Sequence, residues 1–146
     1  MGNPLVAQGV LNRVRGTLSV TDTPALTVTA SYLGKEGISI RPMGNATDIL
    51  PTMAGTVQSQ VPYQQVEITV HLLRTQSMGA SWQSRIASNT DLGEVVVTPD
   101  AATFGDFTVY NTAIVTFGDF AVAGMDAGYQ LTLSGYIITN NDMWNL

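Results

Sequence analysis

Apolar and polar residues alternate along several segments of this chain. The clearest alternation lies in Tyr63–Leu73, where every even position from 66 to 72 is aliphatic and every odd position from 65 to 71 is polar. Side chains alternate across a strand with a period of two, so this segment is predicted to be a strand with one apolar and one polar face. The same alternation predicts strands over Val10–Val20 and Tyr129–Ile138, and the run Val95–Val97 predicts a short buried strand.

Two further patterns predict turns between strands. Alternating residues in Leu26–Tyr32, a Gly-Lys-Glu-Gly loop at 34–37 and the segment Ile38–Arg41 together predict a hairpin. The tetrapeptide Phe-Gly-Asp-Phe occurs at 104–107 and again at 117–120. Because Gly and Asp favour turns, both copies are predicted to form hairpin corners.

Residues 42–62 form the longest stretch without such a pattern, because Pro and Gly interrupt it repeatedly. We expect a long loop here, and loops of this length in a compact domain are usually functional. Its apolar residues, unusual for a solvated loop, are Ile49, Leu50, Met53 and Val57. Two interpretations are open: these side chains dock on a neighbouring copy of the chain, or they tuck onto the core of their own domain.

One helix is predicted, over about Gln76–Ser88, where Met78, Trp82 and Ile86 recur every four residues and form a narrow apolar stripe. Thr75 or Ser77 is expected at its start and Asn89 at its end. The stripe is predicted to lie across the core of the sheet, with partner binding as the alternative.

The two ends of the chain are predicted to lie outside the strands. Residues 1–9 form an extended arm, because Pro4 and Gly9 oppose a helix, and residues 139–146 form a tail. Trp144 is expected to anchor this tail against a neighbouring copy or against the domain itself. With about six to eight strands and one helix, the predicted fold class is mainly β: an antiparallel β-sandwich or barrel with one flanking α-helix, in a single domain over 1–146.

Composition changes this picture in one respect. Apolar residues make up an ordinary 45% of the 146 residues, but charged residues make up only 12%, about half the usual share. A polar, weakly charged surface suits contact between copies of the chain, since buried charge is costly and amides can pair. The alternative is simply a β protein with a neutral surface. Arg13 and Arg15, on one face of the first strand, are candidates for salt links to a neighbour.

Charge and cysteine content exclude several classes. The net charge of −5, with scattered basic residues, argues against sequence-specific nucleic-acid binding. The chain has no cysteine, so it can form no disulfide and no thiolate metal site. We expect no signal peptide and no membrane insertion, because the N-terminus lacks the required regions and no apolar run has the length of a span.

A search for catalytic chemistry finds no convincing set of residues. His71 is the one histidine, which excludes His-rich zinc sites. A Ser or Thr nucleophile with His71 as its base stays open, although no Gly-x-Ser-x-Gly elbow supports it. The acidic residues lie beside turns, and no phosphate-binding loop is present. We therefore expect no enzyme activity and no cofactor.

In length and in the order of its elements, the chain resembles the tail tube proteins of long-tailed bacteriophages, particularly contractile ones. Related proteins are the tube subunits of type VI secretion systems and of phage-like bacteriocins. The matching features are an N-terminal strand pair, the loop at 42–62, the strand Tyr63–Leu73 followed by the helix with Trp82, and the closing strand Tyr129–Ile138. The resemblance covers most of the chain and rests on this arrangement. The Phe-Gly-Asp-Phe repeat is not assigned to the family pattern.

The resemblance implies homohexameric rings that stack into a hollow tube. The sheets of neighbouring subunits would join into one inner barrel, and the 42–62 loop would contact the next ring. Further implied partners are the tail sheath, tape measure protein, baseplate and terminator proteins, while DNA passes through without specific binding. The implied location is the virion tail, after synthesis in the cytoplasm of a host bacterium.

Candidate site residues follow from these expectations. The polar strand faces are predicted to line the lumen through Gln65, Glu67, Thr69, Gln130, Thr132 and Ser134, although these faces could instead point outward. The candidates for contacts between subunits are Arg13, Arg15, Ile49, Leu50, Met53, Val57 and Trp144. The alternative function is a monomeric β-sandwich module that binds sugars or a host surface. It needs clustered aromatics, and the sequence spreads its tyrosines widely, at Tyr32, Tyr63, Tyr110, Tyr129 and Tyr136.

Overall fold

The computed structural model describes residues 9, 16–75, 77–99, 105–120, 123–125 and 128–144, apart from four side chains. Those side chains belong to Met78, Asp119, Phe120 and Trp144. Arg13, Arg15 and the predicted arm before Gly9 therefore lie outside the described residues, as does the expected anchoring role of the Trp144 side chain.

Eight strands and two α-helices make up the described chain. The strands are β1 (Thr17–Val20), β2 (Leu33–Met43), β3 (Thr47–Thr52), β4 (Gly55–Gln60), β5 (Tyr63–Leu73), β6 (Asp91–Thr98), β7 (Phe107–Phe120) and β8 (Gly128–Ile138). The α-helices are α1 (Met78–Ser88) and α2 (Asn141–Trp144), and two 3-10 turns, η1 (Pro24–Leu26) and η2 (Ala30–Tyr32), precede β2. Within the described segments, no helix combines the length and apolarity needed to cross a membrane.

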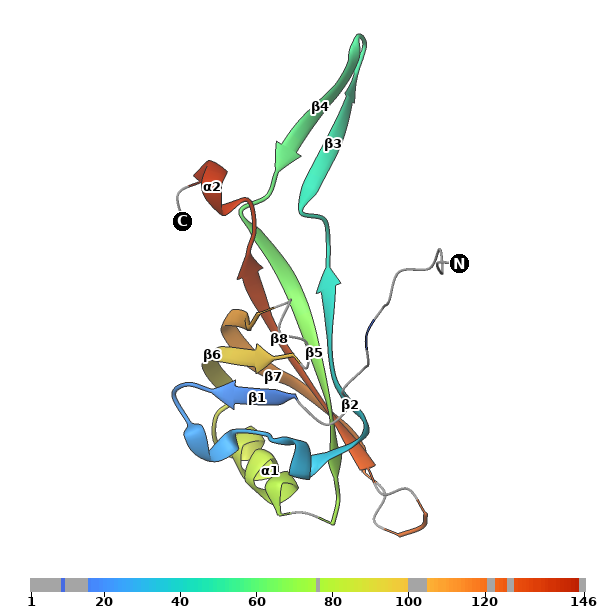
Figure 1. Ribbon diagram of the computed structural model, residues 1–146, viewed down its shortest axis with the longest axis vertical. Coiled ribbons are helices and arrows are strands. Elements are labelled where there is room, and N and C mark those ends of the chain that lie inside the picture. The colour runs from blue at the N-terminus through green and yellow to red at the C-terminus, as the bar shows by residue number, and fades with distance from the viewer. Residues whose placement is uncertain are drawn as a thin grey trace, which may run out of the picture.

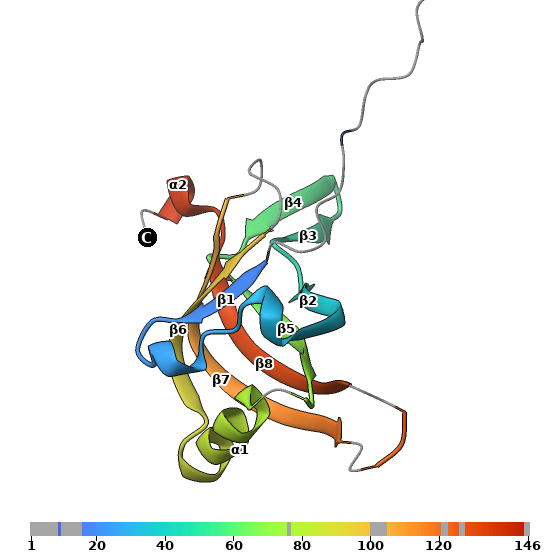
Figure 2. The same cartoon turned by 60° about the horizontal axis from the view of Figure 1, so that its bottom comes forward.

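Six of the strands form one antiparallel sheet in the order β1-β6-β7-β8-β5-β2. The sheet curls, so that β1 and β6 turn over the inner face of the strands at its other side (Figures 1 and 2). Strands β3 and β4 form a separate two-stranded hairpin that extends away from the body. The predicted mainly β, antiparallel class with one flanking helix is confirmed, since α1 lies at one end of the curl.

The core fills the inside of this curl. The four aliphatic residues of β5 at even positions are completely buried, as the alternation predicts, and they share the core with Leu131 and Leu133 of β8. From α1, Trp82 is completely buried and Ile86 packs against the same cluster. Two of the three stripe residues, Trp82 and Ile86, therefore lie on the protein's own core. Ser77 precedes the helix, but its side chain makes no capping hydrogen bond.

The predicted hairpin at 26–41 is wrong. Leu26–Tyr32 is not a strand, because Pro24 starts a 3-10 turn and Val28 makes only an isolated bridge to Leu18. The 34–37 segment is not a turn either. Leu33 pairs with Leu72 and Ile38 pairs with Val70, so the intervening residues of β2 bulge out of one continuous strand.

The prediction for the second Phe-Gly-Asp-Phe copy is also wrong. Residues 117–120 lie within β7, which pairs with β8. A Cβ atom at Gly118 would lie only 3.0 Å from the Cβ of Gln130, so this glycine permits close strand approach and makes no turn. Of the first copy, Gly105 has a φ of 65° and precedes β7, as a turn requires, while Phe104 lies outside the described residues.

Gly79 lies in the first turn of α1, where the helix meets Tyr129 of β8. A Cβ atom at Gly79 would overlap the Tyr129 hydroxyl. Tyr129 cannot swing aside, because it is buried and its ring stacks on Phe117 with centroids 5.2 Å apart. The same burial raises the pKa of the Tyr129 hydroxyl.

We expect Gly79→Ala to lower the free energy of unfolding by about 1–3 kcal/mol, as overpacking does. Helix propensity alone would favour Ala over Gly by about 1 kcal/mol, so the overlap has to outweigh that gain. Gly16→Ala is the matched control, because a Cβ atom there meets only the Thr98 carbonyl oxygen at 3.9 Å. Denaturant unfolding measures both variants, and a Gly79→Ala protein as stable as the parent would contradict the packing of α1 on β8.

Candidate assembly surfaces

The six predicted polar residues of β5 and β8 lie on one face of the sheet. The register pairs Glu67 with Ser134 and Thr69 with Thr132, and places Gln65 and Gln130 in the adjoining pairs. All the aliphatic core residues of these strands point to the opposite face. The prediction that the six residues share one face is confirmed. That this face lines a channel stays a prediction.

Strands β2 and β7 extend this polar face to four strands. The row Ser39, Thr69, Thr132 and Thr116 crosses β2, β5, β8 and β7, and so does the row Arg41, Glu67, Ser134 and Ala113. Sequence reasoning missed the residues from β2 and β7. The alternation of Ser39 and Arg41 with Ile38 and Ile40 carried the necessary signal in β2. Bulges in β7 break the alternation there and hide it.

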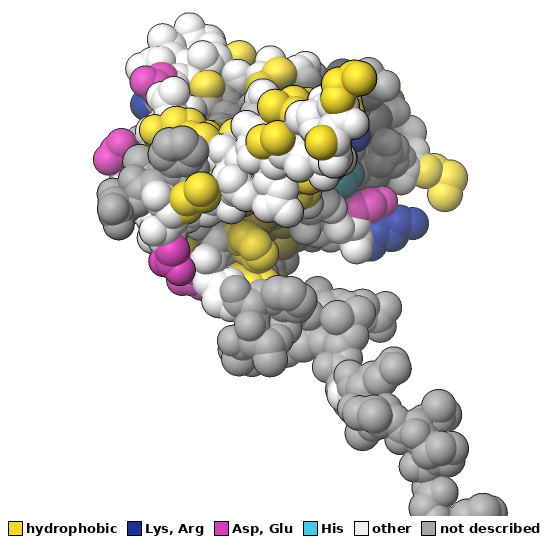
Figure 3. Space-filling model, turned by 90° about the horizontal axis from the view of Figure 1, so that it is seen from above, with side chains coloured by type: hydrophobic (Ala, Val, Ile, Leu, Met, Phe, Trp, Pro, Cys, Tyr) yellow, Lys and Arg dark blue, Asp and Glu magenta, His cyan; other side chains and the backbone are white. Residues whose placement is uncertain are grey.

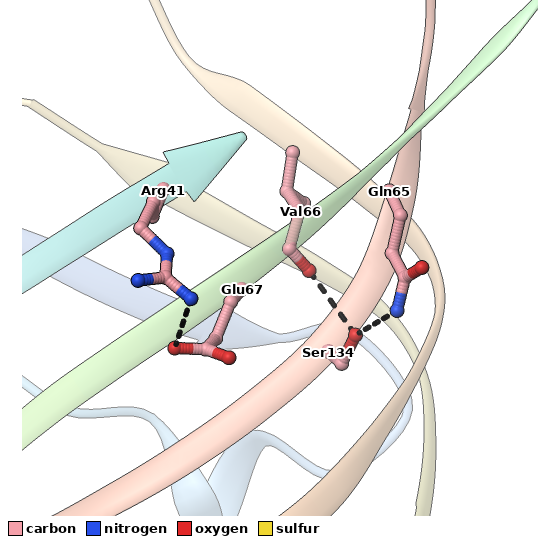
Figure 4. Close-up of polar contacts among 5 residues, drawn as sticks. All are labelled: Arg41, Gln65, Val66, Glu67 and Ser134. Carbon is pink, nitrogen blue, oxygen red and sulfur yellow. Dashed lines mark hydrogen bonds and ion pairs between the residues drawn. The ribbon is translucent and has the colours of Figure 1, made fainter. Parts of the chain in front are cut away.

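Polar contacts within the face are local and weak (Figure 4). Ser134 Oγ donates to the Val66 carbonyl oxygen at 3.3 Å and accepts from Gln65 Nε2 at 3.2 Å. Arg41 Nη2 lies 3.8 Å from Glu67 Oε1, and the Arg41 side chain is 70% exposed. An exposed pair of this kind contributes about 0–1 kcal/mol. Its main effect is that the cation in the middle of the face is balanced by an anion.

His71 lies on the same face beside the β2 bulge. Its Nδ1 donates to the Gly37 carbonyl oxygen at 3.2 Å, so the ring is held by backbone. Among the side chains that the structure describes, no three carboxylates or imidazoles gather as metal ligands do. The expectation that the chain is not an enzyme stays a prediction.

Three tyrosines cluster at the end of this face where β5 begins and β8 ends. The Tyr136 ring meets Tyr63 edge-on at 5.1 Å and Tyr110 at 5.9 Å between centroids. A shallow hollow beside them is lined by Gln65, Asn111, Ser134 and Gly135 as well. The expectation that the tyrosines are too dispersed to cluster is therefore wrong for these three. Strand register brings them together across β5, β7 and β8, which spacing along the chain does not reveal.

Residues 42–62 do not form the predicted irregular loop. Strand β2 continues to Met43, and the β3–β4 hairpin follows, with Leu50 directly opposite Val57. Pro51 and Gly55 suggested a loop, but Pro51 is tolerated because both hairpin strands have an open edge. Ile49, Leu50 and Val57 are at least half exposed and Met53 is fully exposed at the tip. The interpretation that these residues tuck onto their own core is wrong.

Figure 3 looks onto the end of the molecule that carries this hairpin. Hydrophobic side chains are spread over much of that surface, with few charged ones among them. An isolated two-stranded hairpin is only marginally stable in water. Exposed apolar residues on such a hairpin are typical of a surface that another chain covers.

The C-terminal segment holds the base of the hairpin in place. The Asn140 side-chain amide donates to the carbonyl oxygens of Ala46 at 3.0 Å and Val61 at 2.9 Å, which are the two ends of the hairpin. The Thr139 backbone N–H donates to the Pro62 carbonyl oxygen at 2.9 Å. Asn140 adopts a φ of 52°, which Asn tolerates better than most residues. These hydrogen bonds within the chain therefore orient the hairpin relative to the end of β8.

The four-stranded polar face ends in two open strand edges. Strand β2 is the last strand of the sheet. On the other side, β6 pairs with β7 only as far as Ala113, so nothing in the described part of the chain pairs with the outer edge of residues 115–120. Val115, at a bulge in this segment, is 61% exposed. Open edges are templates for pairing with another chain.

Comparison with solved structures places this fold among chains of tail-like particles. A chain of the virion of a native gene transfer agent particle superimposes with a TM-score of 0.59 and 13% identity, over 89% of this chain and 99% of that chain. A chain in the extended-state sheath/tube terminator of PVC, an extracellular contractile injection system, superimposes with a TM-score of 0.56 and 14% identity. The match covers 92% of this chain and 99% of that chain.

A chain in the cap that terminates the tube of the anti-feeding prophage gives a TM-score of 0.53 and 16% identity, over 94% of this chain and 95% of that chain. No protein-family model and no curated protein matches the sequence. At these identities the likeness shows a shared fold, and it extends over nearly the whole of each chain.

Proposed function

We propose that this protein is a structural subunit of a tail tube, in which six copies close into a ring and rings stack into a hollow channel. The observation that carries the proposal is the four-stranded polar face with one open edge on β2 and the other on β7. Chains of similar fold come from tail and injection particles, which supports the same class of role.

The strand directions favour this mode of closure. Across the face each neighbouring pair is antiparallel, so β2 and β7 at its two edges run in opposite directions. When copies are related by rotation about the tube axis, β2 of one copy meets β7 of the next and the pairing is again antiparallel. A head-to-tail contact of this kind closes into a ring if the rotation closes. In such a ring the polar face, opposite the core, would lie toward the axis.

The chemistry of the face suits a conduit for DNA. Its side chains are mostly hydroxyls and amides, and its one central cation, Arg41, lies beside Glu67. Phosphate binding requires unpaired Lys and Arg, because affinity comes from neutralising phosphate charge and releasing counterions. A channel lined this way holds a tape measure protein or passes DNA without retaining it. Sheath, baseplate and terminator proteins would contact the outer surface and the tube ends.

Electron microscopy of the purified protein tests the proposal. A tube subunit should form rings and open-ended tubes that lengthen with concentration. The second candidate function is a subunit of the ring that ends a tube, and such a protein should stop at discrete rings. The similar chains from PVC and from the anti-feeding prophage come from terminator and cap assemblies of this kind. A protein that stays monomeric at high concentration would contradict both candidates.

Adding positive charge to the face should slow DNA release from particles. Gln65→Lys together with Glu67→Lys raises the charge of each copy by three (one plus two) and leaves Arg41 without its partner. We expect release to slow several-fold at low salt and to recover at high salt, because screening shortens the reach of the added charge. Gln65→Glu is the control and should leave the rate unchanged. Equal release rates for all three proteins would show that this face does not line the channel.

A further inference from the structure

The polar face ends, beside the base of the hairpin, in a band of apolar side chains. The band consists of Met43, Tyr63, Tyr110, Tyr136 and Ile138, and we call it the tyrosine rim. Tyr63 is 49% exposed, and Met43 and Ile138 are each 36% exposed. Tyr and Met are enriched in the centres of protein interfaces, and Tyr is frequent among residues that dominate binding energy.

The surroundings of the rim favour a protein over a charged ligand. The hollow beside the tyrosines contains Gln65, Asn111 and Ser134 and no charged side chain. It is shallow, so it cannot enclose a small molecule as ligand pockets usually do. Tyrosines flanked by Asn, Ser, Gly and Gln have the composition of surfaces that bind protein through rigid rings and adaptable hydrogen bonds.

An exposed apolar residue lies at the opposite end of the same strands. Met125, in the connection between β7 and β8, is fully exposed. The neighbouring Gly124 accepts a hydrogen bond from Arg74, just beyond the end of β5, so residues 123–125 lie near that end of the sheet. The rim residues Tyr136 and Ile138 lie near the far end of β8, which begins at Gly128, so at about 3.3 Å per residue they are roughly 26–33 Å from the start of that strand.

We propose that the tyrosine rim of one copy receives Met125 from a copy in the adjacent ring. This proposal rests on the proposed function and identifies a contact between rings. The rim and Met125 lie at opposite ends of the polar face, so rings stacked head to tail bring them together. A methionine thioether interacts favourably with aromatic ring edges. The contact joins different surfaces of each copy, so it repeats along the tube.

Disulfide trapping tests this contact directly, because the chain contains no cysteine. Tubes of a Tyr63→Cys/Met125→Cys protein, after mild oxidation, should give a ladder of linked subunits longer than dimers on a denaturing gel. Each single variant can give dimers at most. A Tyr63→Cys/Ala25→Cys protein, with its second cysteine at an exposed site on η1, should give no ladder. Tubes of the first protein that yield no ladder would overturn the inference and leave the proposed function intact.

A second variant guards against misfolding at Tyr63. Met125→Asp changes only an exposed side chain, so thermal stability should match the parent, while the concentration needed for tubes should rise about tenfold or more, as loss of an interface anchor predicts. Tubes at the parental concentration would overturn the inference. So would saturable binding of neutral oligosaccharides by dispersed subunits that Tyr63→Ala abolishes, which would assign the rim to a sugar. A parent protein that never assembles would overturn the proposed function and this inference together.

Discussion

Replacing residues 47–60 with an Asn-Gly pair should leave the domain folded and abolish tube formation. The Val61 backbone N–H donates to the Ala46 carbonyl oxygen at 3.0 Å, so the two ends already lie at the spacing that a two-residue turn closes. No residue of the hairpin belongs to the core. We expect the free energy of unfolding to change by less than about 0.5 kcal/mol, as for other surface changes. Assembly should be lost, because the exposed apolar side chains of the hairpin would no longer reach another ring.

A pair of substitutions within the intact hairpin separates its shape from its apolar contact. Leu50→Ser with Val57→Ser removes the directly paired apolar side chains, and should weaken assembly. Leu50→Val with Val57→Leu exchanges the same two side chains across the pair and conserves their volume, so assembly should persist. Light scattering and electron microscopy follow both. Tubes of normal length from the excised chain would refute the role of the hairpin in stacking.

The strands nearest to perfect alternation were predictable from the sequence. In β5 and β8, successive residues face the core and the polar side in turn. The alternation of apolar and polar residues was therefore enough to place Val66, Leu133, Gln65 and Ser134 on their correct faces. The helix was predictable for the same reason, since Trp82 and Ile86 follow its period. The prediction of the polar face was therefore half complete, because it included residues from two of the four strands.

Features that depend on register were not predictable. The bulges at 34–37 in β2 and within β7 insert residues that shift the alternation, and they are fixed only by pairing with β5 and β8. The tyrosine cluster joins three strands, and no local signal marks it. The β3–β4 hairpin has exposed residues on both faces, so no buried stripe distinguishes it from a loop. Its order comes from the turn, the ladder and the clamp by Asn140.

The location of the core explains why this domain has a free face at all. The curled sheet buries one side against β1, β6 and α1, and none of the helices and strands that the structure describes forms a second layer on the polar side of β2, β5, β8 and β7. A single domain of this kind keeps that side polar and weakly charged, and it leaves the two strand edges available to neighbours. The arrangement depends on α1 staying packed at the end of the curl.

Trp82→Ala should be the most destabilising single substitution considered, with a loss of about 3–5 kcal/mol in the free energy of unfolding. Trp82 is completely buried and is the main contribution of α1 to the core, so its removal leaves a cavity between the helix and the sheet. Domains of this size have a total stability of about 5–15 kcal/mol, and the loss would bring the protein near its unfolding threshold.

Two further substitutions in α1 make this expectation specific. Gln83→Ala is the matched control, because Gln83 is exposed on the same turn and should change stability by less than about 0.5 kcal/mol. Trp82→Phe should cost much less than Trp82→Ala, since the indole N–H finds no acceptor among the described residues and Phe keeps most of the buried ring. Denaturant unfolding followed by circular dichroism measures all three. If Trp82→Ala and Gln83→Ala unfold at the same denaturant concentration, α1 does not close the core, and the curled sheet must be stabilised without it.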